Sequence, residues 1–205
     1  MRTVWISTCL ASLSITLTLG NRVFAQTSQS CELFNSPGIN TRSVSIQPTM
    51  TRPNTEIEAA ILNISSLGSE IRRLSNSFDF EYSYNLHDLN NDGQADALVQ
   101  IQSQALCGTR GCPQIILIDR GGRYEPVATE AGTHVLGFGQ IIVTENSQDW
   151  DILTFSAYDR SRHVVRYLIK NYDGQRYTGR REVSAGTSLS GTAYLVCGTS
   201  HSLRP

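Results

Sequence analysis

The chain has 205 residues, of which 40% are hydrophobic and 17% are charged, and its formal net charge is −1. This length fits one domain with a core of its own. The near-neutral charge lacks the basic excess that attracts nucleic acid or an anionic membrane surface, so nucleic-acid binding is excluded from the expected functions. An unknown protein or a glycan is the expected partner.

Residues 1–25 predict a secretory signal peptide. Arg2 supplies the positive charge, residues 4–20 carry no charge, and Ala25 is the small residue before the expected cleavage site. The apolar run is diluted by Ser and Thr and falls short of the ~20 apolar residues of a membrane-spanning helix, although an uncleaved anchor helix is the alternative. We expect export to the periplasm or beyond the cell, with no membrane insertion after cleavage. Loss of Arg2 and Arg22 changes the formal charge from −1 to −3.

Residues 26–53 are rich in Ser, Thr, Asn and Pro and predict an extended arm, and residues 54–205 predict a single disulfide-stapled domain. Asn54 or Thr55 can cap a helix, because a short polar side chain at that position accepts hydrogen bonds from the free N–H groups of the first turn. Isoleucines at helical spacing give this helix one apolar face. Gly68 is expected to break or bend it.

From Phe78 onward, apolar residues recur at every second position, which is typical of a strand with one buried face. His87, at the end of this pattern, is expected at the surface. Further strands are predicted at 95–102, 114–119, 124–129, 140–144, 150–157, 164–171, 177–183 and 193–197, the last at an edge. Since no helices separate them, the sequence predicts an α+β fold: a mainly antiparallel β-sheet or sandwich with one N-terminal helix packed on it.

The cysteines predict disulfides. Cys9 leaves with the signal, so four of the five cysteines remain, and an even number in an exported chain favours disulfide bonds. Of the three possible pairings we favour Cys107–Cys112, which closes a short glycine-containing loop, and Cys31–Cys197, which joins the chain ends. A zinc site with all four as ligands is the alternative, but the chain lacks paired CxxC-type spacing.

Residues 88–96 place oxygen-bearing side chains at the spacing of a calcium-binding loop. The candidate ligands are Asp88, Asn90, Asp92, Gln94 through its backbone carbonyl, and Asp96. Position twelve of such a loop, normally a bidentate glutamate, is Val99 here, which predicts weak binding. The alternative is a plain Asn-Asp-Gly hairpin turn without metal. Calcium is therefore the one possible cofactor, and no organic cofactor is expected.

Residues 88–99, followed by the CGTRGC segment 107–112 and an apolar strand, resemble a family of small exported bacterial proteins. That family carries a DxNxDGxxDxxV segment followed by CGxxGC and has no assigned activity, so the resemblance implies no particular reaction. A fainter resemblance is to periplasmic inhibitors of invertebrate-type lysozyme, in which a Ser- and Gly-rich loop enters the lysozyme cleft. By that resemblance the loop Ser103–Gly111 would enter a partner's cleft, and Arg110 at its tip would reach acidic groups there. Thr109, beside it, is the other candidate binding residue. The Cys-bounded loop departs from that family's pattern.

The sequence carries no recognisable catalytic constellation. None of its four histidines has metal-ligand spacing, and no GxSxG, P-loop or GxGxxG motif occurs. Asp149 and Asp151 flank Trp150, and such a carboxylate pair could act on sugars, but the start of an ordinary surface strand explains it as well. We therefore expect a non-catalytic binding module. An inhibitor of a lysozyme-type, cell-wall-degrading enzyme is the first alternative, and a hydrolase with an unrecognised site is the second.

Overall fold

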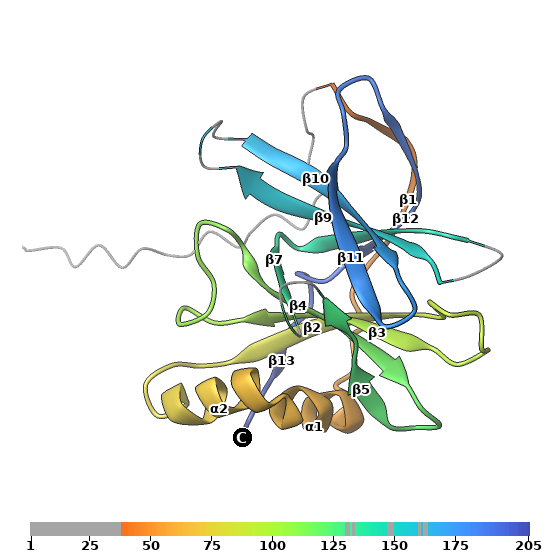
Figure 1. Cartoon of the computed structure of the whole chain (residues 1–205). Helices are drawn as coiled ribbons and strands as arrows, with labels where there is room; N and C mark the ends of the chain where they lie inside the picture. The colour runs from red at the N-terminus through yellow and green to blue at the C-terminus, as the bar shows by residue number, and fades with distance from the viewer. Residues whose placement is uncertain (1–37, 130–131, 133, 147–149, 160, 162–163) are drawn as a thin grey trace, which may run out of the picture.

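The structure, a computed structural model, describes residues 38–205 apart from 130–131, 133, 147–149, 160 and 162–163. The predicted signal peptide, the first part of the predicted arm and Cys31 lie outside the described residues. Figure 1 shows three layers: a pair of helices, a six-stranded sheet next to them, and a seven-stranded sheet on the far side. In the described part of the chain, no helix has the length and apolar character needed to cross a membrane.

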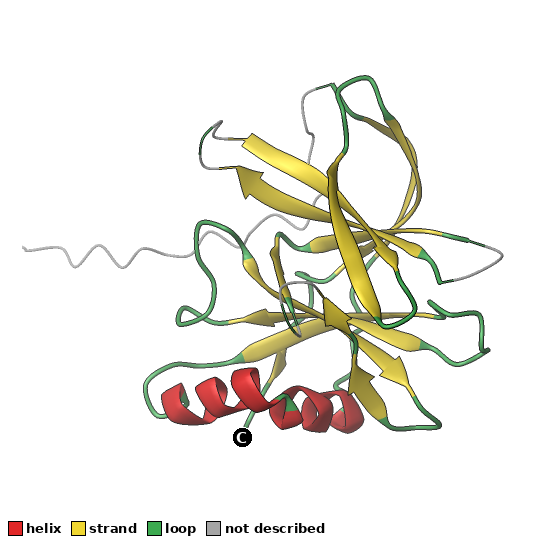
Figure 2. Ribbon diagram, viewed as in Figure 1, coloured by secondary structure: helices red, strands yellow, loops and turns green. Residues whose placement is uncertain are grey.

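Strands are the main regular structure of the described chain, which also has two short helices (Figure 2). The helices are α1 (Thr55–Asn63) and α2 (Ser65–Leu74). The six-stranded sheet contains, in spatial order, β13 (His201–Ser202), β2 (Glu81–His87), β3 (Asp96–Gln102), β4 (Cys112–Asp119) and β5 (Tyr124–Pro126), and β7 (Val135–Gly137) also pairs with β4. The seven-stranded sheet contains, in order, β1 (Asn40–Gln47), β12 (Ser188–Leu195), β8 (Gln140–Thr144), β9 (Ile152–Asp159), β10 (Val164–Tyr172), β11 (Arg176–Glu182) and β6 (Ala128–Thr129). Only β1–β12 and β6–β11 pair in parallel among these strands, so the predicted α+β, mainly antiparallel fold is confirmed.

The helical region differs from its prediction in where it is interrupted. Asn54 caps α1 as expected, because its side-chain oxygen accepts hydrogen bonds from the backbone N–H groups of Glu56 and Ile57. The break falls at Ile64, whose ψ of 112° is extended, so two helices stand where one was expected. Gly68 does not break the helix. It is buried, and a Cβ there would lie 2.0 Å from the Leu62 carbonyl oxygen, so glycine permits the close contact between α1 and α2.

Strand β2 is buried on both faces, whereas the alternating pattern predicted one solvent-facing side. One face packs on the helices through Tyr82 and Tyr84. The other face is covered by the seven-stranded sheet, so the polar residues Ser83 and Asn85 are buried as well. The Asn85 side-chain amide donates to the carbonyl oxygens of Pro48 (2.8 Å) and Leu195 (2.9 Å), which satisfies it in the interior.

The N-terminal and C-terminal segments also differ from expectation. Residues 40–47, which were predicted as part of an extended arm, form the edge strand β1, and this strand pairs with β12. The predicted edge strand 193–197 overlaps the end of the longer β12, which stops at Leu195, lies between β1 and β8 and is therefore internal. The composition of residues 40–47 suggested an extended chain, but it did not indicate that this segment would pair with β12, a strand distant in the sequence.

Candidate functional site

The loop between β2 and β3 is held by hydrogen bonds from its own backbone to its polar side chains. The carboxylate of Asp88 accepts from the N–H groups of Asp92 (3.1 Å) and Gly93 (2.8 Å). Asn90 Oδ1 accepts from the N–H of Asp92 (3.1 Å), and Asp92 Oδ1 accepts from the N–H of Gln94 (2.9 Å). The side chain of Gln94 reaches outside the loop, where its Oε1 accepts from the N–H of Gly121 (3.0 Å). The loop is thus a compact, internally bonded turn.

Asp96 is the buried anchor of this loop. Its two carboxylate oxygens accept from the N–H of Leu89 and the N–H of Asp119, both at 2.9 Å, and so join the loop to the turn between β4 and β5. Burial raises the pKa of Asp96 to about 6, although these two N–H groups act to lower it, and the negative charges of Asp92 and Asp88 raise it further. A carboxylate in this position braces the fold and carries an electrostatic cost when it is ionised.

The five predicted calcium ligands lie in this one loop, but their geometry is that of a hydrogen-bonded turn. Within the described residues, no group of three or more His, Cys, Asp or Glu side chains is placed to hold a metal ion. Carboxylate oxygens of Asp88, Asp92 and Asp96 accept hydrogen bonds from backbone N–H groups, as in a polar turn without metal. Calcium binding stays a prediction from the sequence.

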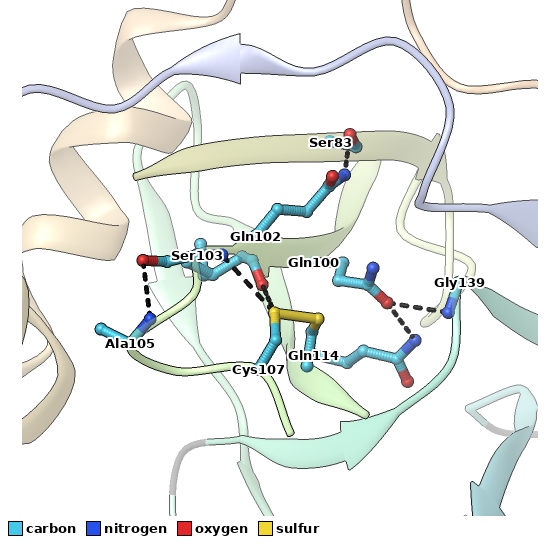
Figure 3. Close-up of a disulfide and its surroundings, with 10 residues drawn as sticks. Ser83, Gln100, Gln102, Ser103, Ala105, Cys107, Gln114 and Gly139 are labelled. Atoms are coloured by element: carbon cyan, nitrogen blue, oxygen red, sulfur yellow. Dashed lines mark hydrogen bonds between the residues drawn. A yellow bond between two sulfur atoms is a disulfide. The ribbon is translucent and has the colours of Figure 1, made fainter. Parts of the chain in front are cut away.

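The loop between β3 and β4 is closed by the predicted Cys107–Cys112 disulfide, which is confirmed (Figure 3). Inside the ring, the N–H of Gly108 donates to the carbonyl of Gly111 (3.0 Å) and the N–H of Gly111 donates to that of Gly108 (2.9 Å). This pairing leaves Thr109 and Arg110 as the two residues of a tight turn, both exposed. Arg110 forms no ion pair with any residue that the structure describes.

The base of this loop is fixed by close backbone packing and a buried amide network. Gly111 has a φ of +101°, and a Cβ there would lie 2.2 Å from the Gly137 carbonyl oxygen on β7. Beside the disulfide, Figure 3 shows the buried Gln100, whose Oε1 accepts from Gln114 Nε2 (3.0 Å) and from the N–H of Gly139 (2.8 Å). The tip therefore projects from a rigid support.

Of the second predicted disulfide, Cys31–Cys197, the structure describes only one cysteine. Cys197 is disulfide-bonded, and its predicted partner Cys31 lies outside the described residues.

A hydrogen-bonded chain of three side chains was missed by the sequence reasoning. His87 Nε2 lies 2.7 Å from Asp151 Oδ2, and His87 Nδ1 lies 2.7 Å from the Tyr194 hydroxyl. The Asp151 side chain is only 3% exposed, and its Oδ1 accepts from the N–H of Asn146 (2.7 Å). Burial raises the pKa of Tyr194, and the negative charges of Glu145 and Asp151 raise it further. The imidazole is thus held on both sides, by Asp151 just before β9 and by Tyr194 of β12.

His87, the central residue of these three, also borders a cleft of about 340 Å³ between β8, β12 and the end of β2. The cleft is lined by His87, Val143, Thr144, Glu145, Ser190, Gly191 and Thr192.

Two sequence predictions are corrected by this site. His87 was expected at the surface, but it lies in the interface between the sheets with 18% of its side chain exposed. Asp151 was interpreted as the start of an ordinary surface strand, but it is buried because the loop 88–96 covers it: its N–H donates to the Leu89 carbonyl (2.9 Å). The other carboxylate of the suggested pair, Asp149, lies outside the described residues.

No protein-family model matches the chain, and no curated protein or solved structure matches it either. The two resemblances noted in the sequence therefore stay predictions, and the function has to be argued from the geometry of the chain.

Proposed function

We propose that the protein is an exported, non-catalytic binding module that presents the disulfide-closed loop 103–112 to a protein partner. The observation that carries this proposal is the exposed two-residue tip, Thr109 and Arg110, on a base fixed by the Cys107–Cys112 disulfide. A loop that is already ordered loses little conformational entropy when it binds, so more of its contact energy appears as affinity.

The disulfide also supports the exported location. Disulfides form and persist in oxidising compartments such as the bacterial periplasm and are rare in the cytosol. The signal peptide predicted at residues 1–25 would deliver the chain there.

A more specific form of this proposal is an inhibitor of a cell-wall-degrading enzyme of the lysozyme type. Arg110 carries a positive charge that pairs with no described residue. Glycosidases present two carboxyl groups about 5–10 Å apart in an open cleft. A guanidinium at the end of a narrow loop fits such a cleft, because its planar array of donors matches a carboxylate with two parallel hydrogen bonds.

Inhibition measurements on a panel of lysozymes test this proposal. Arg110→Ala should weaken inhibition by about 30-fold or more, which is expected when one partner of a desolvated ion pair is removed. Arg110→Lys should restore only part of it, because an ammonium cannot form the two parallel bonds. Arg123→Ala, which removes an exposed arginine from the turn between β4 and β5, is the matched control. An unchanged inhibition constant for Arg110→Ala would rule out the loop mechanism.

We also propose that calcium, bound weakly, braces the loop 88–96. The support is electrostatic: Asp88 and Asp92 raise the pKa of Asp96, so negative charges repel one another across this loop. A divalent cation would neutralise that repulsion, and it can use oxygen lone pairs that the N–H groups leave open.

Thermal unfolding with and without millimolar Ca²⁺ tests the calcium proposal. A ligand that binds only the folded state raises the midpoint by mass action. We expect a rise that is lost in Asp92→Ala and kept in the control Asp79→Ala, which removes an exposed carboxylate ahead of β2. The same midpoint with calcium and with EDTA would leave the loop as a plain polar turn.

A further inference from the structure

We propose that the cleft beside His87 is a second ligand site and that it takes a neutral, hydroxyl-rich molecule, that is, a carbohydrate. In the pairing of β2 with β3, His87 lies opposite Asp96 at the start of β3. The loop 103–112 follows the other end of that strand. The two sites therefore lie at opposite ends of the six-stranded sheet, as Figure 1 shows for the loops on either side of β3. The cleft is independent of the protein-binding loop.

The chemistry of the lining decides the class of ligand. Three hydroxyl side chains, Thr144, Ser190 and Thr192, line the cleft together with the exposed carboxylate of Glu145. Each hydroxyl both donates and accepts hydrogen bonds, and a carboxylate accepts several. Sugar hydroxyls have this same mixed character. Among the residues that the structure describes, no lysine or arginine lines the cleft, so they offer no lysine or arginine counter-charge to an anionic ligand such as a phosphate.

The wall formed by His87 is rigid. Both ring nitrogens are already bonded, one to the carboxylate of Asp151 and one to the hydroxyl of Tyr194. The ring is therefore held in one orientation, and it has ring carbons rather than a free nitrogen to offer the cleft. An apolar ring surface beside a few fixed polar groups is typical of small-ligand sites. It also argues for binding rather than acid–base catalysis, because a general base needs a free nitrogen in contact with its substrate.

The shape of the cleft is built into the strands. Gly191 has a φ of +118°, and a Cβ there would lie 2.1 Å from the Val143 carbonyl oxygen. This close approach of β12 to β8 places Thr144 beside Ser190, whose carbonyl accepts the Thr144 hydroxyl (2.9 Å). The Thr192 hydroxyl is positioned by Ser45 Oγ of β1 (2.9 Å). The volume of about 340 Å³ lies at the small end of the ~300–1,000 Å³ range of ligand pockets, which suits a short sugar.

Calorimetric titration of the full mature chain tests the inference. The probes are two neutral sugars, the N-acetylglucosamine trimer and maltotriose, with spermidine as a cationic probe and inorganic phosphate as an anionic one. We expect one of the sugars to bind. Thr192→Val, which keeps the side-chain shape, should weaken that binding about three- to tenfold, the effect of one lost hydrogen bond. Glu145→Gln should weaken it as well.

Matched controls separate the cleft from the rest of the surface. Thr51→Val and Glu125→Gln change exposed residues outside the cleft and should bind sugar like the parent chain. Arg110→Ala should also leave sugar binding unchanged, because it alters only the opposite end of the sheet. Thermal midpoints establish that each variant is folded. The inference is overturned if neither sugar binds, if only a charged probe binds, or if a folded Thr192→Val variant binds sugar with unchanged affinity.

Discussion

Replacement of Asp96 by asparagine should change how the stability of the protein depends on pH. Asp96 is fully buried, and its pKa is about 6 in the folded protein against an ordinary value of 3.8. Asparagine has nearly the same shape and resembles the neutral acid, although its amide accepts only one of the two N–H groups that Asp96 accepts. That loss should be about the same at every pH.

The magnitude follows from the linkage between proton binding and folding. Between pH 3.8 and about 6 the folded chain holds the Asp96 proton more tightly than the unfolded chain does, so stability falls as the pH rises through this window. Each pKa unit corresponds to 1.36 kcal/mol, which gives a loss of about 3 kcal/mol by pH 7. The free energy of unfolding of Asp96→Asn, relative to the parent, should therefore rise by about 3 kcal/mol between pH 3.5 and pH 7.

Urea unfolding followed at several pH values in EDTA measures this difference. Asp79→Asn, which removes an exposed carboxylate, controls for the loss of one acid. A parent-to-variant difference that stays constant across the pH range would refute the reasoning. Repeating the series in millimolar calcium adds a second comparison, since a cation bound near Asp96 would favour its ionised form and flatten the pH dependence of the parent.

Three further substitutions test the packing at Gly111 and the cap of α1. Gly111→Ala should cost about 2–4 kcal/mol in urea unfolding, because it combines a left-handed backbone with a Cβ 2.2 Å from the Gly137 carbonyl oxygen. Gly121 also has a positive φ, +76°, but a Cβ there would meet open space, so Gly121→Ala should cost only about 1–2 kcal/mol. Equal losses in the two variants would show that the contact with Gly137 is unimportant. Asn54→Ala should lower the free energy of unfolding by about 1 kcal/mol through loss of the helix cap, and no change would contradict the capping role.

Local patterns predicted the local elements of this fold. The cap at Asn54 and the short disulfide ring at 107–112 depend on neighbours in sequence, and each is found. The alternating pattern of β2 was correct in position but wrong in its exposed face. Alternation in one strand reports polarity, and Ser83 and Asn85 are polar residues buried under a second sheet that this pattern does not reveal.

The chain of His87, Asp151 and Tyr194 could not be predicted for a related reason. Its members are 64 and 107 residues from His87, and no spacing links them. They meet only because the end of β2 lies beneath β9 and β12 when the two sheets pack together. In the sequence, His87 falls on the same face of the strand as Ser83 and Asn85. That pattern indicated a polar face, but not which residues would lie against it.

The pairing of β1 with β12 has a consequence for how the protein is made. These strands are far apart in the sequence, and Asn40 lies opposite Ser188, 148 residues later. Synthesis runs from the N-terminus, so β1 must wait without its partner until β12 has been made. During that time it presents open backbone N–H and C=O groups, which can pair with another chain. The exposed polar side chains along β1 reduce this hazard, and completion of the seven-stranded sheet becomes a late step that depends on β12.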